Sequence, residues 1–298
     1  MNSRSQKGKL IIIITLLSIL LVSTFAFFKF KNDTKSNNSS ETSSKEETVS
    51  IDSDTENDYS KDSNRFEGTK LTSEDVGVPV LYYHSVLPDS EVTTPNEVTI
   101  SPEKLKQELE IVKNLGYTTI TLSELNDYLN NKIEIPEKSI VITFDDGYTD
   151  NYIHAFPILK ELGMKATVFM ISSQINSGYY MSAEQLKEMS DYGIDIESHT
   201  DTHAYLDTLS YDEQLKEMTE SKRKLEEVLG KDVTSIAYPF GNYNKDTVKA
   251  SEAAGYTLGF TTNKGLDKRT SNKLELDRIY VSSTYSLDTF KERLLNTK

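Results

Sequence analysis

Two adjacent carboxylates close an apolar stretch near the middle of the chain. Residues 140–148 read Ile-Val-Ile-Thr-Phe-Asp-Asp-Gly-Tyr, so a run with β propensity ends at Asp145 and Asp146. A buried charge is costly to desolvate unless it is paired or bound to a metal ion. We therefore expect both aspartates at the end of a strand, facing a cleft, with a positive group close by. Because Asp-Gly is a common turn pair, an ordinary turn is the alternative for this segment taken alone.

A second polar cluster follows another short apolar stretch. Residues 194–198 precede His-Thr-Asp-Thr-His, which places His199 and His203 four positions apart and uses two of the chain's four histidines. Imidazole and carboxylate groups are ligands that Zn²⁺ and related divalent ions accept. Residues four apart lie on one face of a helix, so we expect both imidazoles to reach one ion from a helical turn. Exposed histidines at the start of a helix are the alternative.

Strands and helices alternate around these motifs. The predicted strands are 78–83, 117–121, 139–144, 166–171, 194–198, 235–238, 258–261 and 278–281, and the predicted helices are 102–115, 122–130, 155–162, 183–191, 211–229, 245–254 and 287–295. This alternation predicts a parallel α/β sheet, closed or nearly closed. Seven or eight units in about 220 residues favour a (β/α) barrel, with an open doubly wound sheet as the alternative. The polar motifs all follow predicted strands, at the face where barrel active sites are built.

Composition and the amino-terminal segment suggest where the chain works. The net charge of −14 argues against a nucleic-acid partner, and the absence of cysteine excludes disulfides. Residues 10–28 are apolar and flanked by basic residues, which predicts a membrane anchor over 1–31, with a cleaved signal peptide as the alternative. Residues 32–75 are polar and predict a disordered linker. The folded domain, 76–298, is then expected outside the cell.

Three motifs together resemble those of the polysaccharide deacetylases, carbohydrate esterase family 4. They are Thr143-Phe144-Asp145-Asp146-Gly147, His199-Thr-Asp-Thr-His203 and Tyr238-Pro239-Phe240-Gly241. The resemblance extends over roughly residues 78–295. It implies removal of acetyl groups from N-acetylglucosamine in chitin, peptidoglycan or exopolysaccharide, by a divalent metal ion held on a distorted (β/α) barrel.

The resemblance also implies roles for individual residues. Asp145 corresponds to the general base, and Asp146, His199 and His203 correspond to the metal ligands. Amide hydrolysis needs an activated water and a polarised carbonyl, and one metal ion supplies both. A set of two histidines and one aspartate suits Zn²⁺, although Co²⁺, Ni²⁺ and Fe²⁺ are also compatible.

The chain departs from the family pattern in two ways. Many members have an arginine where this chain has Ala237, and the late tryptophan and histidine motifs are missing. Instead, residues 79–85 read Pro-Val-Leu-Tyr-Tyr-His-Ser and resemble the intercellular adhesin deacetylases, which act on poly-N-acetylglucosamine. In that branch the acid histidine comes from the first strand, so His84 is the expected general acid. A buried, hydrogen-bonded structural histidine is the alternative, and Arg278 is the expected substitute for the missing arginine.

Further residues are expected around the substrate. Tyr238, Pro239, Phe240 and Arg278 are predicted to contact it. Tyr179 and Tyr180 either line a sugar-binding groove or plug the space between barrel and loop, and His154 is expected at the surface.

The resulting hypothesis is a monomeric metal-dependent N-deacetylase of a membrane-anchored type. Its expected partners are the membrane and an acetylated glucosamine polymer, namely poly-N-acetylglucosamine, with peptidoglycan as the alternative. A non-catalytic glycan-binding module is the alternative of another class. The set of a base beside three metal ligands favours the enzyme, because a pure binder needs no base.

Overall fold

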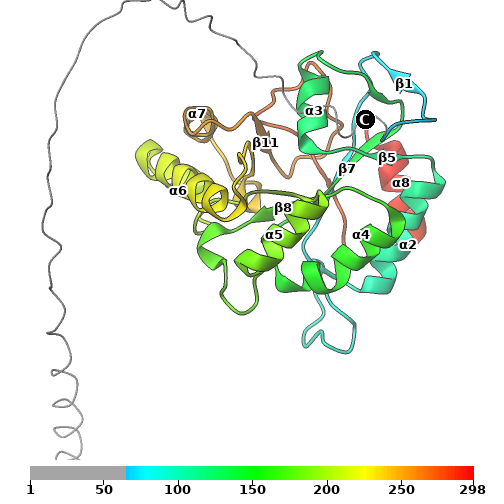
Figure 1. Ribbon diagram of the computed structural model, residues 1–298, viewed down its shortest axis with the longest axis horizontal. Helices are drawn as coiled ribbons and strands as arrows, with labels where there is room; N and C mark the ends of the chain where they lie inside the picture. Colours follow the sequence, from blue (N-terminus) through cyan, green and yellow to red (C-terminus); the bar gives the residue numbers. More distant parts are fainter. Residues whose placement is uncertain (1–64) are drawn as a thin grey trace, which may run out of the picture. The chain divides into compact units, whose positions relative to one another are not determined.

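The computed structural model describes residues 65–298. A curled sheet forms its centre, in the order β11-β10-β9-β8-β7-β2-β12, with β5 also paired to β7 (Figure 1). The strands are β2 (Val80–Tyr83), β5 (Thr118–Thr119), β7 (Ser139–Phe144), β8 (Thr167–Met170), β9 (Asp195–Ser198), β10 (Ser235–Ala237), β11 (Leu258–Phe260) and β12 (Ile279–Tyr280). Each pairing within this sheet is parallel, so the predicted parallel α/β architecture is confirmed.

The sheet curls into a half-barrel whose two edges, β11 and β12, do not pair as regular strands. Leu276 lies between them and forms a parallel bridge with Phe260 of β11. The Leu276 N–H donates to the Gly259 carbonyl at 2.7 Å, and the Thr261 N–H donates to the Leu276 carbonyl at 2.8 Å. Directly afterwards the chain forms β12 beside β2. One short segment therefore links both edges, and the expected barrel is present as a half-barrel with an irregular closure.

Seven helices within the described residues pack around the sheet. They are α2 (Pro102–Asn114), α3 (Leu122–Leu129), α4 (Phe156–Leu162), α5 (Ala183–Tyr192), α6 (Tyr211–Leu229), α7 (Lys245–Ala253) and α8 (Leu287–Asn296). Ser101, Thr121, Ser182 and Ser210 each accept a backbone N–H in the first turn of their helix, which is why these helices begin there. All seven lie close to their predicted positions.

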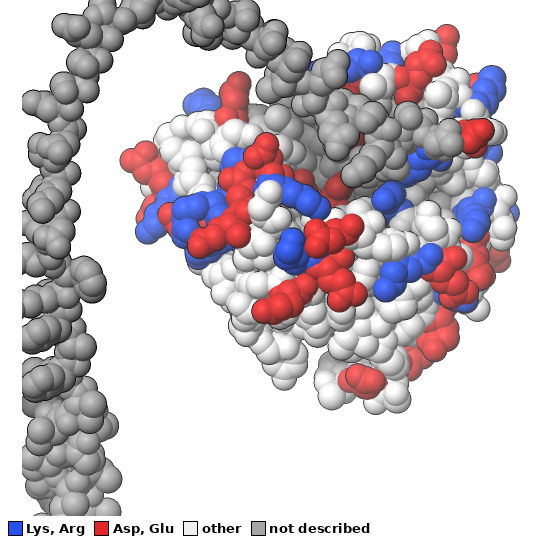
Figure 2. Space-filling model, in the orientation of Figure 1, with Lys and Arg blue, Asp and Glu red and all other residues white. Residues whose placement is uncertain are grey.

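Charged side chains on the outer surfaces of the helices are largely of mixed sign. On α6, Arg223 pairs with Glu220 and Glu227, and Lys222 pairs with Glu226. Figure 2 shows acidic and basic groups interspersed over the face drawn. Exposed pairs of this kind contribute little stability, so the helices are held mainly by their apolar faces.

Alternate strand residues fill two separate cores, because side chains along a strand point to opposite faces. The outer core lies under the helices and includes Leu81, Ile142, Val168, Ile196 and Ile236. The inner core includes Val80, Val141, Phe169, Ala237 and Phe260. Strands buried on both faces read as continuous apolar runs, which is the pattern seen in the sequence.

Helix α3 packs against the inner core at the amino-terminal ends of the strands. Leu122, Leu125 and Leu129 belong to this core, and the Leu122 N–H donates to Asp195 at 2.9 Å. In Figure 1, α3 lies at one end of the sheet and the cyan loop after β2 projects from the other. The carboxyl ends of the strands are therefore left for the polar motifs.

Residues 65–75, expected within the linker, belong to the folded unit. β1 (Leu71–Thr72) pairs antiparallel with β6 (Ile135–Pro136), and Arg65 pairs with Glu124 on α3. Sequence composition missed these contacts because only two residues of the segment enter a strand.

The expected location as a single-pass membrane protein requires correction. No helix between residues 65 and 298 is long and apolar enough to cross a membrane. The apolar stretch that suggested an anchor, residues 10–28, lies outside the described residues.

Candidate active site

Strand register brings the polar motifs to one edge of the sheet. Tyr83 pairs with Phe144 between β2 and β7, and Met170 pairs with Ser198 between β8 and β9. The residues that follow these strand ends are His84, the Asp145–Asp146 pair and His199. Since parallel strands end on the same side, these side chains gather although they come from distant parts of the sequence.

Asp146, His199 and His203 form a group that could hold a metal ion, with ligand atoms within 4.8 Å of one another. Asp146 Oδ1 lies 3.5 Å from His199 Nε2 and 3.4 Å from His203 Nε2. Burial lowers the pKa of His199 to about 3 and also lowers that of His203, so both imidazoles are neutral, which is the form that binds metals. Three protein ligands leave a coordination position for substrate or water.

A backbone carbonyl sets the tautomer of His199. Nδ1 lies 2.8 Å from the Ala237 carbonyl oxygen, and a carbonyl can only accept. Nδ1 therefore carries the proton and donates it, which leaves the Nε2 lone pair directed toward Asp146. Such an orienting hydrogen bond to the second ring nitrogen is typical of metal-binding histidines. The backbone of Ala237, at the position where the family arginine is missing, thus takes part in the site.

The predicted helical turn across the two histidines is wrong. Thr200 and His203 have φ angles of 63° and 61°, and Asp146 has a φ angle of 73°. These left-handed conformations cost ~1–3 kcal/mol each in non-glycine residues and persist only where surrounding structure holds them. Residues 199–203 therefore form a constrained loop that turns His203 back toward Asp146, a geometry that residue spacing does not reveal.

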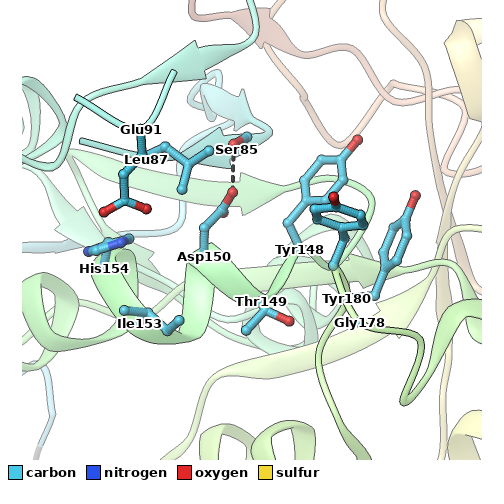
Figure 3. A pocket seen from close by; sticks show the side chains of 11 residues that line it. Ser85, Leu87, Glu91, Tyr148, Thr149, Asp150, Ile153, His154, Gly178 and Tyr180 are labelled. Carbon is cyan, nitrogen blue, oxygen red and sulfur yellow. Dashed lines mark hydrogen bonds between the residues drawn. The ribbon is translucent and has the colours of Figure 1, made fainter. Parts of the chain in front are cut away.

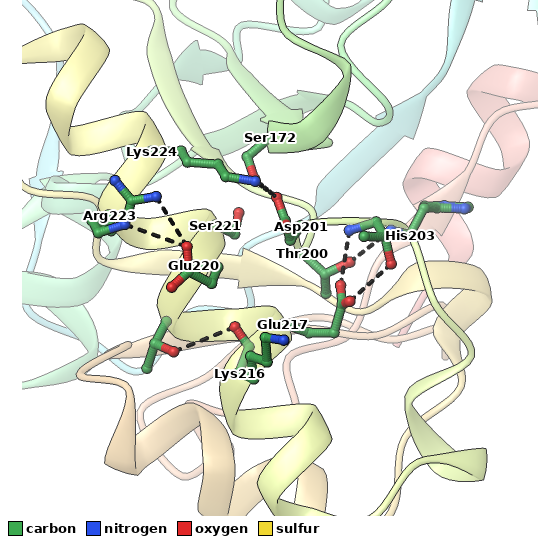
Figure 4. Close-up of polar contacts among 12 residues, drawn as sticks. Ser172, Thr200, Asp201, His203, Lys216, Glu217, Glu220, Ser221, Arg223 and Lys224 are labelled. Atoms are coloured by element: carbon green, nitrogen blue, oxygen red, sulfur yellow. Dashed lines mark hydrogen bonds and ion pairs between the residues drawn. The ribbon is translucent and has the colours of Figure 1, made fainter.

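Helix α6 and the end of β8 hold this ligand loop (Figure 4). Glu217 accepts hydrogen bonds from the Thr202 N–H and hydroxyl, both at 2.8 Å. Asp201 accepts from Ser172 Oγ and Lys224 Nζ, both at 2.6 Å. Asp201 is thus engaged in the support of the loop, and the carboxylate that joins the two histidines comes from Asp146.

A buried ion pair lies beneath the metal-ligand group. Arg278 Nη1 is 2.7 Å from Asp145 Oδ1, and Nη2 is 2.9 Å from Oδ2. The guanidinium therefore donates two parallel hydrogen bonds to the carboxylate. Arg278 Nε donates to the Thr261 carbonyl at 2.8 Å, and the guanidinium lies 4.3 Å from the centre of the Tyr82 ring. Burial raises the pKa of Asp145, but Arg278, together with His199 and His84, outweighs burial and lowers the pKa to about 2. Asp145 is therefore ionised at neutral pH.

His84 lies on the same side as the two aspartates. Its side chain is half-buried, and its charge contributes to the pKa of both Asp145 and Asp146. Among the described residues, its Nδ1 is buried and has no hydrogen-bond partner. Asn151 fixes the backbone here by donating to the His84 carbonyl at 2.8 Å. The imidazole is thus placed near the carboxylates without being committed to a structural hydrogen bond.

The Pro-Phe-Gly motif contributes an aromatic wall beside His203. Phe240 has a φ angle of 59°, and its ring centre lies 4.4 Å from that of His203. Tyr205, which sequence reasoning missed, stacks on Phe240 at 4.0 Å with an interplanar angle of 5°. Both rings are about half exposed, so they form a surface beside the metal-ligand group.

Other residues of this motif have structural positions. Tyr238 is fully buried and donates to the Leu274 carbonyl at 2.8 Å, so the structure does not bring it to the site. Pro239 is also buried. A Cβ on Gly241 would lie 1.9 Å from Thr262 Oγ1, which explains the glycine. Tyr238 was predicted to contact the substrate because it belongs to the Tyr-Pro-Phe-Gly motif. Its side chain points into the core, whereas that of Phe240 is exposed.

Comparison with known proteins matches the chain to one family. A family model described as "Polysaccharide deacetylase" matches residues 132–259. The Bacillus subtilis (strain 168) protein YxkH, provisionally named as a polysaccharide deacetylase, is 38% identical over 219 residues, covering 74% of this chain and 76% of its own. The poly-beta-1,6-N-acetyl-D-glucosamine N-deacetylase of Staphylococcus epidermidis is 31% identical over 200 residues. The match covers 62% of this chain and 68% of that protein.

A solved structure supports the same match. The Streptococcus pyogenes deacetylase PplD, in complex with acetate, superposes with a TM-score of 0.69 at 33% sequence identity. The superposition covers 75% of this chain and 99% of PplD, which places the whole of that domain on the described fold.

Proposed function

The chain belongs to the polysaccharide deacetylase family, whose members hydrolyse amide bonds, and from that premise we propose that it removes acetyl groups from poly-N-acetylglucosamine. The observation that carries this proposal is His84, an imidazole directly after β2 whose charge contributes to the pKa of both Asp145 and Asp146. The similarity to a relative named for that polymer supports the substrate.

Asp146, His199 and His203 are the residues proposed to hold a divalent metal ion. The neutral imidazoles, the fixed tautomer of His199 and the shared carboxylate oxygen fit such an ion. A bound divalent ion supplies Lewis acidity that polarises the acetamide carbonyl and lowers the pKa of water. The donor set suits Zn²⁺, and Co²⁺, Ni²⁺ and Fe²⁺ remain compatible.

Asp145 and His84 are proposed to move the protons. Asp145 is kept ionised by Arg278 and acts as general base, taking a proton from the attacking water. His84 acts as general acid and donates a proton to the leaving amine, so that water and the amide become acetate and an amine. Phe240 and Tyr205 are proposed to support the sugar beside the site.

Acetate release tests this proposal. Purified protein is stripped with a chelator, reloaded with single divalent ions and incubated with poly-N-acetylglucosamine, peptidoglycan or chitin oligomers. We expect acetate to be released from poly-N-acetylglucosamine only when the protein is loaded with a metal ion. The His199→Ala variant should lose both the bound metal and the activity. Acetate from peptidoglycan alone would reassign the substrate. Bound metal without acetate from any polymer would make the chain a glycan-binding module.

A further inference from the structure

A cavity of about 560 Å³ adjoins the site between the segment after β2, the helical turn Asn151–Ala155 and residues 178–180. Its size falls in the ~300–1,000 Å³ range of ligand pockets. Figure 3 shows Tyr148 and Tyr180 at one end and Glu91 and His154 at the other. His154, expected at the surface, lines this cavity.

Two tyrosines connect the cavity to the metal-ligand group. Tyr148 follows Asp146 by two residues, and its ring stacks on Tyr180 at 5.2 Å and 25°. Residues 147–149 and 179–181 are held together by backbone hydrogen bonds, including Thr149 N–H to the Tyr179 carbonyl at 2.8 Å. Since Ser85 directly follows His84 and also lines the cavity, a polymer lying in the site can continue into it.

The lining combines aromatic rings with negative charge. Tyr179 is 85% exposed, and the faces of Tyr148, Tyr179 and Tyr180 offer the flat apolar surface on which a pyranose ring packs. Two carboxylates, Asp150 and Glu91, line the cavity, and no lysine or arginine among residues 65–298 does. A cation-bearing sugar is therefore favoured over a neutral one.

Asp150 is a fixed part of this wall. It accepts hydrogen bonds from Ser85 Oγ at 2.6 Å, from the Val86 N–H at 3.0 Å and from Asn151 Nδ2 at 2.8 Å. Glu91 is exposed, and its carboxylate lies over His154 in Figure 3. Glu91 is thus the carboxylate that can adjust to a ligand, and it can be changed without disturbing the fold.

Deacetylation itself creates the matching ligand, because it turns a neutral acetamide into an amine that is protonated at neutral pH. We propose that this cavity is a subsite for an already deacetylated glucosamine residue, so that the enzyme prefers an acetylated unit near a free amine. This inference rests on the proposed function. It predicts that deacetylation proceeds in blocks along the polymer and is not random.

Defined oligomers test the subsite with the full chain. The ratio kcat/KM is measured on the pentamer of N-acetylglucosamine and on pentamers that carry one glucosamine at each position in turn. We expect about a fivefold preference for one glucosamine position, the upper range for a partly exposed carboxylate–ammonium pair. Glu91→Gln should remove the preference and leave kcat/KM on the fully acetylated pentamer unchanged. Glu252→Gln, an exposed change on α7, is the matched control and should keep it.

A binding measurement separates this inference from the proposed function. The affinity of the fully deacetylated glucosamine pentamer is measured by calorimetry, which needs no turnover. Weaker binding to Glu91→Gln than to wild type and Glu252→Gln supports the subsite even if no acetate is released. Equal affinities in all three proteins, or equal kcat/KM on all pentamers, would overturn it.

Discussion

Replacing Arg278 with methionine removes the guanidinium from Asp145 and leaves an unbranched side chain in the barrel interior. Both side chains of the pair are almost completely buried, so no water takes the place of the lost bonds. The carboxylate would then be a buried charge without its main partner, which is the costly arrangement.

The size of the effect follows from the pKa of Asp145. Arg278, with smaller contributions from His199 and His84, lowers it to about 2, below the ordinary value of 3.8, although burial pushes it upward. Without Arg278, burial prevails and the pKa rises above 3.8, a change of at least about two units or ~2.5 kcal/mol. This agrees with the ~3–5 kcal/mol typical of removing one partner from a buried pair.

The pH dependence of stability should change sign. In the wild type the folded-state pKa is depressed, so the pair stabilises the fold above about pH 3.8 and this contribution is lost as pH falls toward 2. In Arg278→Met the folded-state pKa is raised, so the free energy of unfolding should fall as pH rises. Urea unfolding between about pH 2 and 8 measures both trends.

Activity supplies the second measurement. If Asp145 is the base, the acid limb of the kcat/KM profile should move upward by at least about two pH units in Arg278→Met. Arg278→Lys is the control, because it keeps the charge but cannot form two parallel bonds, and it should give an intermediate shift. An Arg278→Met protein with unchanged stability and an unchanged acid limb would refute the reasoning.

Three further predictions concern single residues. Asp145→Asn should retain metal, measured by elemental analysis, while kcat falls by ~10²–10⁴; normal turnover would remove it from the mechanism. His84→Ala should retain fold and metal but lose a similar factor together with the basic limb of the pH–rate profile, and an unchanged limb would contradict the acid role. Burial raises the pKa of Glu108 to about 7, so wild-type stability should fall as pH rises from about 4.5 to 7. Glu108→Gln should reduce this fall in urea unfolding by up to ~3 kcal/mol, while the buried carboxyls of Asp195 and Asp267, whose pKa values are also raised, keep the remainder; an identical slope would contradict it.

The ends of the strands at the site were predictable because a change from apolar to charged residues marks them in the sequence. The apolar run of β7, buried on both faces, stops where Asp145 begins, and this boundary is visible in the sequence. Helix starts were equally visible, since Ser182 and Ser210 cap the helices that follow them. Predictions of element type therefore agree closely with the structure.

The three-dimensional details of the site were less accessible to sequence reasoning. Nothing local indicates that Thr200 and His203 take left-handed conformations, because these depend on contacts from α6. The burial of Tyr238, directly after β10, depends on its side chain pointing toward the outer core. The contact of Arg278 with Asp145 was only a hypothesis, because it joins residues 133 positions apart.

That separation has a consequence for how the protein is made. Synthesis proceeds from the amino terminus, so Asp145, the proposed base, emerges long before the Arg278 guanidinium that pairs with it. The same late segment carries Leu276 and β12, which link the two edges of the sheet. A nascent chain that ends before residue 278 therefore contains all three proposed metal ligands but lacks the guanidinium beside Asp145. We therefore expect catalytic activity to require the carboxyl-terminal segment. A chain truncated before residue 278 should be inactive although it retains Asp146, His199 and His203.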